Sequence, residues 1–235
     1  MKLEIINLSK SYDKNEVLKE IDFTFEEGKI YGLLGRNGAG KTTFFNALNE
    51  DINIDSGFFN LIDEYGTNKL SIKDIGYVIS TPVVPEFLTG REFLDFFLSI
   101  NKDKIKDLKE IDYYFDLVKI KREDQDKLLK DYSHGMRNKM QILINIISNP
   151  KIILLDEPLT SLDIVVQEEM KKLLKELKKE HIIIFSTHIL ELAMDLCDEI
   201  VILNNKKLEI VEKNNLNTKK YKDKIIKCLK DNKND

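Results

Sequence analysis

Short apolar stretches along the first 35 residues have the period of β-strands. Residues 3–8 and 21–25 alternate apolar and polar side chains, as expected of strands in a half-buried sheet. Residues 30–34 follow a turn at Glu27-Gly28 and are continuously apolar, as expected of a strand covered on both faces. We therefore predict a half-buried sheet at the start of the chain, followed by a buried strand.

Two more buried strands are predicted on either side of a helix. Residues 151–155 and 181–185 include apolar runs of strand length. Between them, apolar side chains recur at the i, i+3, i+4, i+7 spacing of one helix face: Met170, Leu173, Leu174 and Leu177. A strand–helix–strand order with apolar strands predicts a parallel sheet that helices cover.

The middle of the chain lacks this strand pattern and is expected to form a helical insert. Thr89 and Glu92 have the spacing of a capping box, and an aromatic helical pattern follows them. We predict one domain over 1–235. The α/β core comprises residues 1–85 and 150–210, with the β-subdomain in its first part. The helical subdomain comprises residues 86–149, and a lysine-rich C-terminal tail comprises residues 211–235.

Composition excludes several classes of protein. No apolar run approaches the about 20 residues that a membrane-spanning helix needs, and the first residues are charged too early for a secretory signal. The net charge of −4 argues against a general nucleic-acid binder. Cys197 and Cys228 lack the spacing of metal ligands and are expected to be reduced thiols. These features predict a soluble intracellular protein.

A phosphate-binding loop follows the first buried strand. The pattern G-x-x-x-x-G-K-[ST], with one further hydroxyl residue, comprises Gly35, Arg36, Asn37, Gly38, Ala39, Gly40, Lys41, Thr42 and Thr43. Glycines let consecutive backbone N–H groups converge on phosphates, Lys41 supplies a positive charge, and the Thr42 hydroxyl can coordinate Mg²⁺. A chance glycine-rich turn would not explain the lysine, the hydroxyl and the flanking elements together. Nucleotide binding is predicted, with kinases, GTPases and motor ATPases all open.

Two carboxylates and a histidine follow the later buried strands. Asp156 is suited to hold Mg²⁺, and Glu157 can polarise a water that attacks the γ-phosphate. The alternative is that both carboxylates are simply solvent-exposed acidic residues at the end of a strand. His188, after the next strand, is placed to donate to the γ-phosphate and to orient Glu157, although an isolated histidine is more often structural.

The order of these motifs resembles that of ABC-type ATPases. Residues 131–136, Asp-Tyr-Ser-His-Gly-Met, precede an apolar helix and are similar to the family's signature motif. Leu-Leu-Asp-Glu-Pro at 154–158 is similar to the Walker B motif, and Ser161-Leu162-Asp163 to the D-loop. The resemblance covers nearly the whole chain. It implies an α/β fold of the P-loop NTPase type: a RecA-like, mainly parallel sheet with an N-terminal antiparallel β-subdomain and an α-helical insert.

The resemblance also implies roles that the residues alone do not establish. Tyr12 would stack on adenine, although a bare tyrosine there would more often be a surface aromatic at a strand end. Ser133, His134 and Gly135 would contact the ATP held by another subunit, with hydroxyl, backbone amide and helix dipole forming an anion site. Asp163 would belong to the D-loop. Hydrolysis would then require a head-to-tail pair of subunits around two nucleotides.

The chain departs from the family pattern at two motifs. His134 and Met136 replace a glycine and a glutamine of the signature, and Ser80 stands where the family's Q-loop has glutamine. The missing carboxamide leaves coupling through this loop in doubt. These departures are similar to those of bacterial antibiotic-resistance and bacteriocin-immunity exporter ATPases, which is an analogy to a subgroup.

The expected function is that of an ATP-hydrolysing motor subunit, with ATP and Mg²⁺ as cofactors. Its partners would be a second ATPase subunit, identical or paralogous, and an integral membrane permease that exports a drug or antimicrobial peptide. The protein would then be cytoplasmic and peripheral on the inner face of the membrane. The alternatives are a soluble ABC ATPase acting on nucleic acid or ribosomes, which the single cassette and short insert disfavour, and a non-hydrolysing regulatory subunit.

Aromatic residues in the helical insert are candidates for a groove that receives a permease helix. They are Phe87, Phe93, Phe96 and Phe97. We expect Phe93 and Phe97 to pack inside the subdomain instead, and we leave Phe87 open. The lysine-rich tail is expected to be a solvated helical face, with binding to anionic lipid as the alternative.

Overall fold

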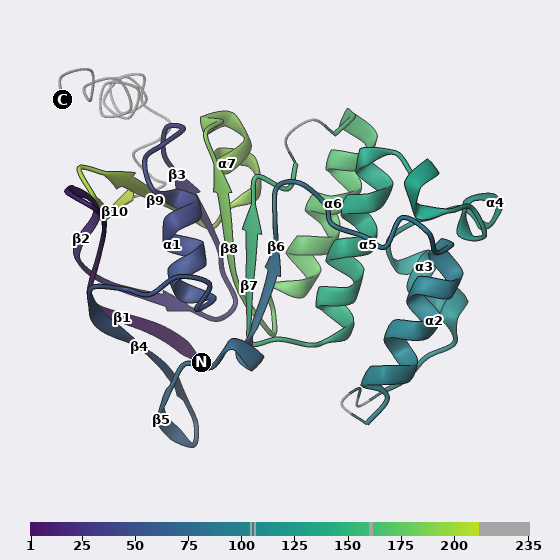
Figure 1. The fold of residues 1–235 in the computed structure, drawn as a ribbon, viewed down its shortest axis with the longest axis horizontal. Helices are drawn as coiled ribbons and strands as arrows, with labels where there is room; N and C mark the ends of the chain where they lie inside the picture. Colours follow the sequence, from purple (N-terminus) through teal and green to yellow (C-terminus); the bar gives the residue numbers. More distant parts are fainter. Residues whose placement is uncertain (104, 106, 160–161, 212–235) are drawn as a thin grey trace.

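The computed structural model describes residues 1–103, 105, 107–159 and 162–211. Residues 212–235 of the tail expected at 211–235 lie outside the described residues, and so does Ser161 of the D-loop-like segment. Cys228 is among these undescribed tail residues. Two sheets and a set of helices make up the described part of the chain (Figure 1). No helix within it combines the length and the apolar character needed to cross a membrane.

The first sheet is antiparallel and has the strand order β2-β1-β4-β5. These strands are β1 (Lys2–Tyr12), β2 (Asn15–Glu26), β4 (Ser56–Asp63) and β5 (Gly66–Lys69). β1 pairs with both β2 and β4, and its register shifts at several points. The N-terminal antiparallel β-subdomain is therefore confirmed. It also contains β4 and β5, two strands after residue 55 that the sequence pattern did not predict.

The second sheet is mainly parallel and has the order β10-β9-β3-β8-β7-β6. Its strands are β3 (Ile30–Leu34), β6 (Ile75–Val78), β7 (Ile152–Asp156), β8 (Ile182–Thr187), β9 (Glu199–Asn204) and β10 (Lys207–Val211). The neighbouring strands from β6 to β9 pair in parallel, and β10 pairs antiparallel with β9 at the edge. The three predicted buried strands, β3, β7 and β8, lie side by side in its centre.

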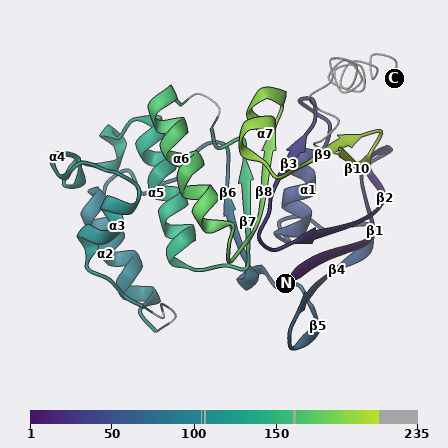
Figure 2. The same cartoon turned by 180° about the vertical axis from the view of Figure 1, so that it is seen from behind.

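Both faces of the parallel sheet are covered, which explains the continuous apolar runs. Ile152 and Leu154 of β7 pack in one core with β1, β2, β4 and the helix α1 (Lys41–Leu48). Ile153 and Leu155 belong to a second core, which includes residues of α5 (His134–Ile147), α6 (Ile164–Leu177) and α7 (Leu190–Leu196). Figure 1 shows α1 between the two sheets, and Figure 2 shows α6 and α7 in front of the opposite face.

The helical insert extends from the side of the parallel sheet that carries β6 (Figure 1). It contains α2 (Gly90–Asn101), α3 (Ile111–Leu117), α4 (Arg122–Gln125), the 3₁₀ turn η2 (Leu129–Asp131) and α5; a separate 3₁₀ turn, η1 (Ile72–Asp74), precedes β6. The predicted capping box at the start of α2 is formed in both directions by Thr89 and Glu92. Phe93 and Phe97 pack against the core, as expected, whereas Phe87 is 78% exposed.

Candidate nucleotide-binding site

The loop between β3 and α1 has a backbone that requires glycine at two positions. Gly38 and Gly40 have φ angles of 82° and 102°, in the left-handed region that other residues rarely adopt. A Cβ on Gly40 would also lie 2.8 Å from Cγ1 of Val17. The loop therefore wraps tightly before α1 begins at Lys41, with Gly40 as its N-cap.

Lys41 is a buried cation at the centre of this loop. Its Nζ donates hydrogen bonds to the carbonyl oxygens of Gly35 at 2.8 Å and Arg36 at 3.1 Å, and it lies 3.6 Å from Oε1 of Glu157. Burial lowers the pKa of Lys41, while the charges of Glu157 and Asp156 oppose that shift. An incompletely compensated buried ammonium favours an anionic ligand beside it.

Asp156 ties the loop to the ends of two parallel strands. This buried residue accepts a hydrogen bond from Oγ1 of Thr42 at 2.8 Å and another from the hydroxyl of Ser186 at 2.5 Å. Asp156 and Ser186 are register partners at the carboxyl ends of β7 and β8. The predicted pairing of Thr42 with Asp156 therefore occurs, and it depends on Ser186, whose role the sequence interpretation missed.

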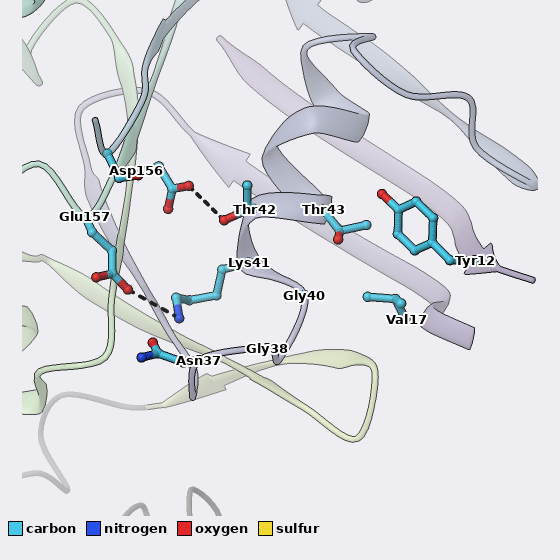
Figure 3. Close-up of a pocket in the computed structure, with 11 residues that line it drawn as sticks. Tyr12, Val17, Asn37, Gly38, Gly40, Lys41, Thr42, Thr43, Asp156 and Glu157 are labelled. Carbon is cyan, nitrogen blue, oxygen red and sulfur yellow. Dashed lines mark hydrogen bonds and ion pairs between the residues drawn. The ribbon is translucent and has the colours of Figure 1, made fainter. Parts of the chain in front are cut away.

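Glu157 and His188 are brought together beside the loop. Nδ1 of His188 lies 3.1 Å from each carboxylate oxygen of Glu157. Because an ionised carboxylate only accepts hydrogen bonds, Nδ1 carries the proton in this contact. The backbone N–H of Glu157 donates to the hydroxyl of Ser186 at 3.0 Å, and its φ of 48° is left-handed. This turn directs the Glu157 carboxylate towards Lys41 (Figure 3).

Lys41, Thr42, Asp156 and Glu157 line an open pocket with a volume of about 370 Å³. Its lining comprises Tyr12, Val17, Asn37, Gly38, Gly40, Lys41, Thr42, Thr43, Ser80, Asp156 and Glu157. A second hollow of about 350 Å³ is lined by Gly35, Arg36, Asn37 and His188. Of the predicted loop residues, Ala39 alone lines neither hollow.

The main pocket has an acidic end and an aromatic end. In Figure 3 the carboxylates of Asp156 and Glu157 lie on one side of the loop and the Tyr12 ring lies on the other, beyond Thr43. Tyr12 is the last residue of β1 and is 45% exposed, with Nζ of Lys10 at 4.9 Å from its ring centroid. The half-exposed ring thus stands at the end of the pocket away from the carboxylates.

The signature-like residues lie elsewhere in the protomer. Ser133 is the N-cap of α5 and accepts a hydrogen bond from the N–H of Met136 at 3.2 Å. Ser133 and His134 are exposed, and neither they nor Gly135 line the two hollows. Asp163 is the N-cap of α6 and accepts from the N–H of Val166 at 3.0 Å. A single protomer thus leaves the start of α5 apart from its own phosphate loop.

Comparison with known proteins identifies the family. Residues 18–160 match the family model described as ABC transporter. An uncharacterized ABC transporter ATP-binding protein of Methanocaldococcus jannaschii, MJ1023, is 36% identical over 88% of this chain and 75% of its own length. The bacitracin transport ATP-binding protein BcrA of Enterococcus faecalis is 32% identical over 86% of this chain and 66% of its own length.

Solved structures share the fold. The ATP-binding subunit of an ABC transporter superposes with a TM-score of 0.73 at 25% identity, over 88% of each chain. A dimeric post-hydrolysis state of the ATP-binding cassette MJ0796, bound to ADP and Pi, has the same TM-score at 22% identity, over 88% of this chain and 96% of that chain. The chain therefore belongs to the ABC transporter family, as an ATP-binding subunit that carries the family's ATPase domain.

Proposed function

We propose that this chain is the motor subunit of a transporter, in which two ATPase subunits close around two ATP molecules and drive a separate membrane permease. The arrangement of Lys41, Glu157 and His188 at the phosphate loop carries this proposal. The ammonium of Lys41, the carboxylate of Glu157 and the imidazole of His188 lie in one cluster, which would supply a cation for the phosphates and a base beside them. A non-hydrolysing regulatory subunit would not need this cluster.

In this proposal Lys41 changes partners when the triphosphate binds. The phosphate oxygens replace the carbonyls of Gly35 and Arg36 and the carboxylate of Glu157 as its acceptors. Glu157 is then free to accept a proton from a water whose oxygen bonds to the γ-phosphorus. The bond from that phosphorus to the β–γ bridging oxygen breaks, which yields ADP and phosphate. His188 holds the Glu157 carboxylate in place through Nδ1.

The residues present fit a bound Mg²⁺ ion. Oγ1 of Thr42 and Oδ2 of Asp156 face each other at 2.8 Å, and both are the hard oxygen donors that Mg²⁺ prefers. Thr42 would hold the ion, with Asp156 acting directly or through water. When bound, the ion would neutralise charge on the β- and γ-phosphates. We also propose that Tyr12 stacks on the adenine ring.

The signature-like turn suits the role of a phosphate contact between protomers. Ser133 and Gly135 stand at the exposed N-terminus of a 14-residue helix, where the helix dipole favours an anion. The distant position of this turn from the loop of its own protomer is consistent with action on a partner's nucleotide. The dimeric form of the MJ0796 cassette supports the same arrangement.

The likeness to BcrA favours export of a drug or antimicrobial peptide as the transport reaction. The chain would then work at the cytoplasmic face of the membrane, attached to its permease. Purification of the chain from detergent-solubilised membranes tests this part of the proposal, because a bound integral membrane permease should copurify. Copurification with ribosomes or nucleic acid instead would favour the soluble alternative.

The catalytic assignment is tested with Glu157→Gln. The neutral amide keeps the shape of the side chain but cannot accept the proton, so turnover should fall by about a thousandfold. In the presence of ATP the variant should then accumulate as a stable dimer, measured by analytical ultracentrifugation. Glu180→Gln, at an exposed turn, is the control and should leave turnover unchanged. Undiminished turnover of Glu157→Gln would show that another group is the base.

A further inference from the structure

Two segments of the helical insert are joined through their main chains just before the signature-like turn. The N–H of Leu129 donates to the carbonyl of Leu88 at 2.8 Å, and the N–H of Lys130 donates to the carbonyl of Glu86 at 3.2 Å. η2 is therefore attached to the segment that precedes α2. Because η2 leads directly through Tyr132 to Ser133, the place of that segment sets the place of the turn.

Arg137 completes this junction from the first turn of α5. Its Nε donates to the carbonyl of Leu129 at 3.1 Å, and its Nη2 donates to the carbonyl of Lys130. Its Nη1 lies 3.6 Å from Oε1 of Glu86. One guanidinium thus contacts both η2 and the segment before α2, and it stands four residues after Ser133.

The choice of arginine at this position is informative. Only four of the 37 basic residues in the chain are arginine. A guanidinium presents donors in a rigid planar fork, which suits two successive carbonyls and a carboxylate, whereas a lysine ammonium is a point charge. Arg91 shows the same use in this insert, because its three nitrogens contact Asp112, Asp126 and Gln125.

The junction connects the turn with the nucleotide pocket and with two exposed apolar residues. Glu86 precedes Phe87, and both Phe87 and Val83 are exposed apolar residues, at 78% and 69%. The same segment begins at Ser80, which lines the nucleotide pocket. The chain from 80 to 88 therefore runs from the pocket over an exposed apolar surface to the junction that Arg137 closes.

We propose that Arg137 is a positioning residue that fixes the Ser133 turn relative to the segment from 80 to 88, so that the turn meets the triphosphate of a partner protomer. This inference rests on the proposed function, because it requires the turn to act across a dimer. It predicts that loss of the Arg137 guanidinium weakens ATP-dependent dimerisation, while the phosphate loop of each protomer still binds nucleotide normally.

The test uses Arg137→Lys in the Glu157→Gln background, where hydrolysis does not dissolve the dimer. Arg122→Lys is the matched control, because Arg122 is exposed at the start of α4. Dimerisation with ATP and Mg²⁺ is measured by analytical ultracentrifugation, and ADP affinity by calorimetry. ADP reports binding within one protomer, because it lacks the γ-phosphate that Ser133 of the partner would contact.

Arg137→Lys should raise the dimer dissociation constant about tenfold, the scale of one charge-assisted hydrogen bond, and leave ADP affinity within about twofold. Glu86→Gln leaves the hydrogen bonds of Arg137 to the carbonyls of Leu129 and Lys130 in place. It should therefore raise the dimer dissociation constant only about twofold. Unchanged dimerisation of Arg137→Lys, or an equal loss of ADP affinity, would overturn the inference. If the parent protein with Glu157→Gln does not dimerise at all, the proposed function fails and the inference fails with it.

Discussion

The phosphate loop and the signature-like turn both stand at helix N-termini, but different parts of the molecule hold them in place. At the loop, Asp156 and Ser186 are fixed by the register of β7 and β8, and Thr42 is tied to Asp156. At the turn, Ser133 has one capping hydrogen bond, and its location depends on side chains of the insert. The sheet thus sets the geometry of the first site, and the helical insert sets that of the second.

This difference separates nucleotide binding from dimerisation. Changes around the loop should alter nucleotide affinity in a single protomer, since every group that lines that pocket belongs to the same protomer. Changes around the turn should leave that affinity intact and affect only processes that need two protomers. Substitutions in the two regions therefore test the comparison directly.

The largest effect expected on nucleotide binding is that of Lys41→Met. Loss of the central cation should weaken ADP binding, measured by calorimetry, by more than about a hundredfold, because several charge-assisted contacts are lost together. Lys172→Met, on the exposed face of α6, is the control and should bind normally. Normal ADP binding by Lys41→Met would show that this loop is not part of the nucleotide-binding site.

The same variant has an expected signature in stability. Because burial lowers the pKa of Lys41 below 10.5 in the folded protein, its charged form opposes folding at neutral pH. Lys41→Met should therefore raise the thermal midpoint at pH 7, and the gain should shrink as the pH rises through the folded pKa towards 10.5. A lower midpoint at pH 7 would contradict this account of Lys41.

An intermediate effect is expected at Gly90, the first residue of α2. A Cβ there would lie 2.0 Å from Oη and 2.9 Å from Cζ of Tyr132, which is buried and precedes Ser133. Gly90→Ala should lower the free energy of unfolding by about 2 kcal/mol, measured with urea, and should reduce ATP turnover without changing ADP affinity.

Tyr132→Phe is the companion variant. The Tyr132 hydroxyl is buried and has no hydrogen-bond partner among the described residues, so its removal should change stability by less than about 1 kcal/mol. Combined with Gly90→Ala, it should restore part of the lost stability, because the closest clash disappears. If the changes in unfolding free energy of the two single variants simply add in the double variant, the predicted clash between a Cβ at position 90 and the Tyr132 hydroxyl is absent.

A smaller effect than at the phosphate loop is expected for Ser133→Ala. Turnover should fall about tenfold while ADP affinity stays constant, and loss of the cap should cost about 1 kcal/mol of stability. Thr89→Ala removes a similar cap from α2 and serves as the control for stability. If Thr89→Ala lowers turnover as much as Ser133→Ala does, the turn has no special contact with phosphate.

The sequence predicted the elements whose own residues determine them. Residues 30–34 form β3 within the predicted bounds, and β7 and α6 occupy the predicted places. In contrast, β5 contains only exposed residues and exists through main-chain pairing with β4, which no periodicity reveals. β10 was likewise not predicted as a strand, and it exists as a sheet edge through its pairing with β9.

The same distinction applies to the site. Lys41, Thr42, Asp156, Glu157 and His188 were identified from their motifs and do meet at one sheet edge. Val17 and Ser186 were missed. Ser186 reaches Asp156 only through the parallel register of β7 and β8, although its position at a strand end could have suggested it. Val17 lies in a strand whose approach to Gly40 depends on the packing of two sheets.

The left-handed backbone at Glu157 limits which residues can replace it. A φ of 48° disfavours any residue branched at Cβ, so valine, isoleucine or threonine would add backbone strain of about 1–3 kcal/mol to the loss of the carboxylate. Asparagine tolerates this conformation better than most residues, and glycine would relax it. An inactive protein with an undisturbed main chain is therefore best sought among unbranched amides, and random mutagenesis at this codon would confuse misfolding with loss of chemistry.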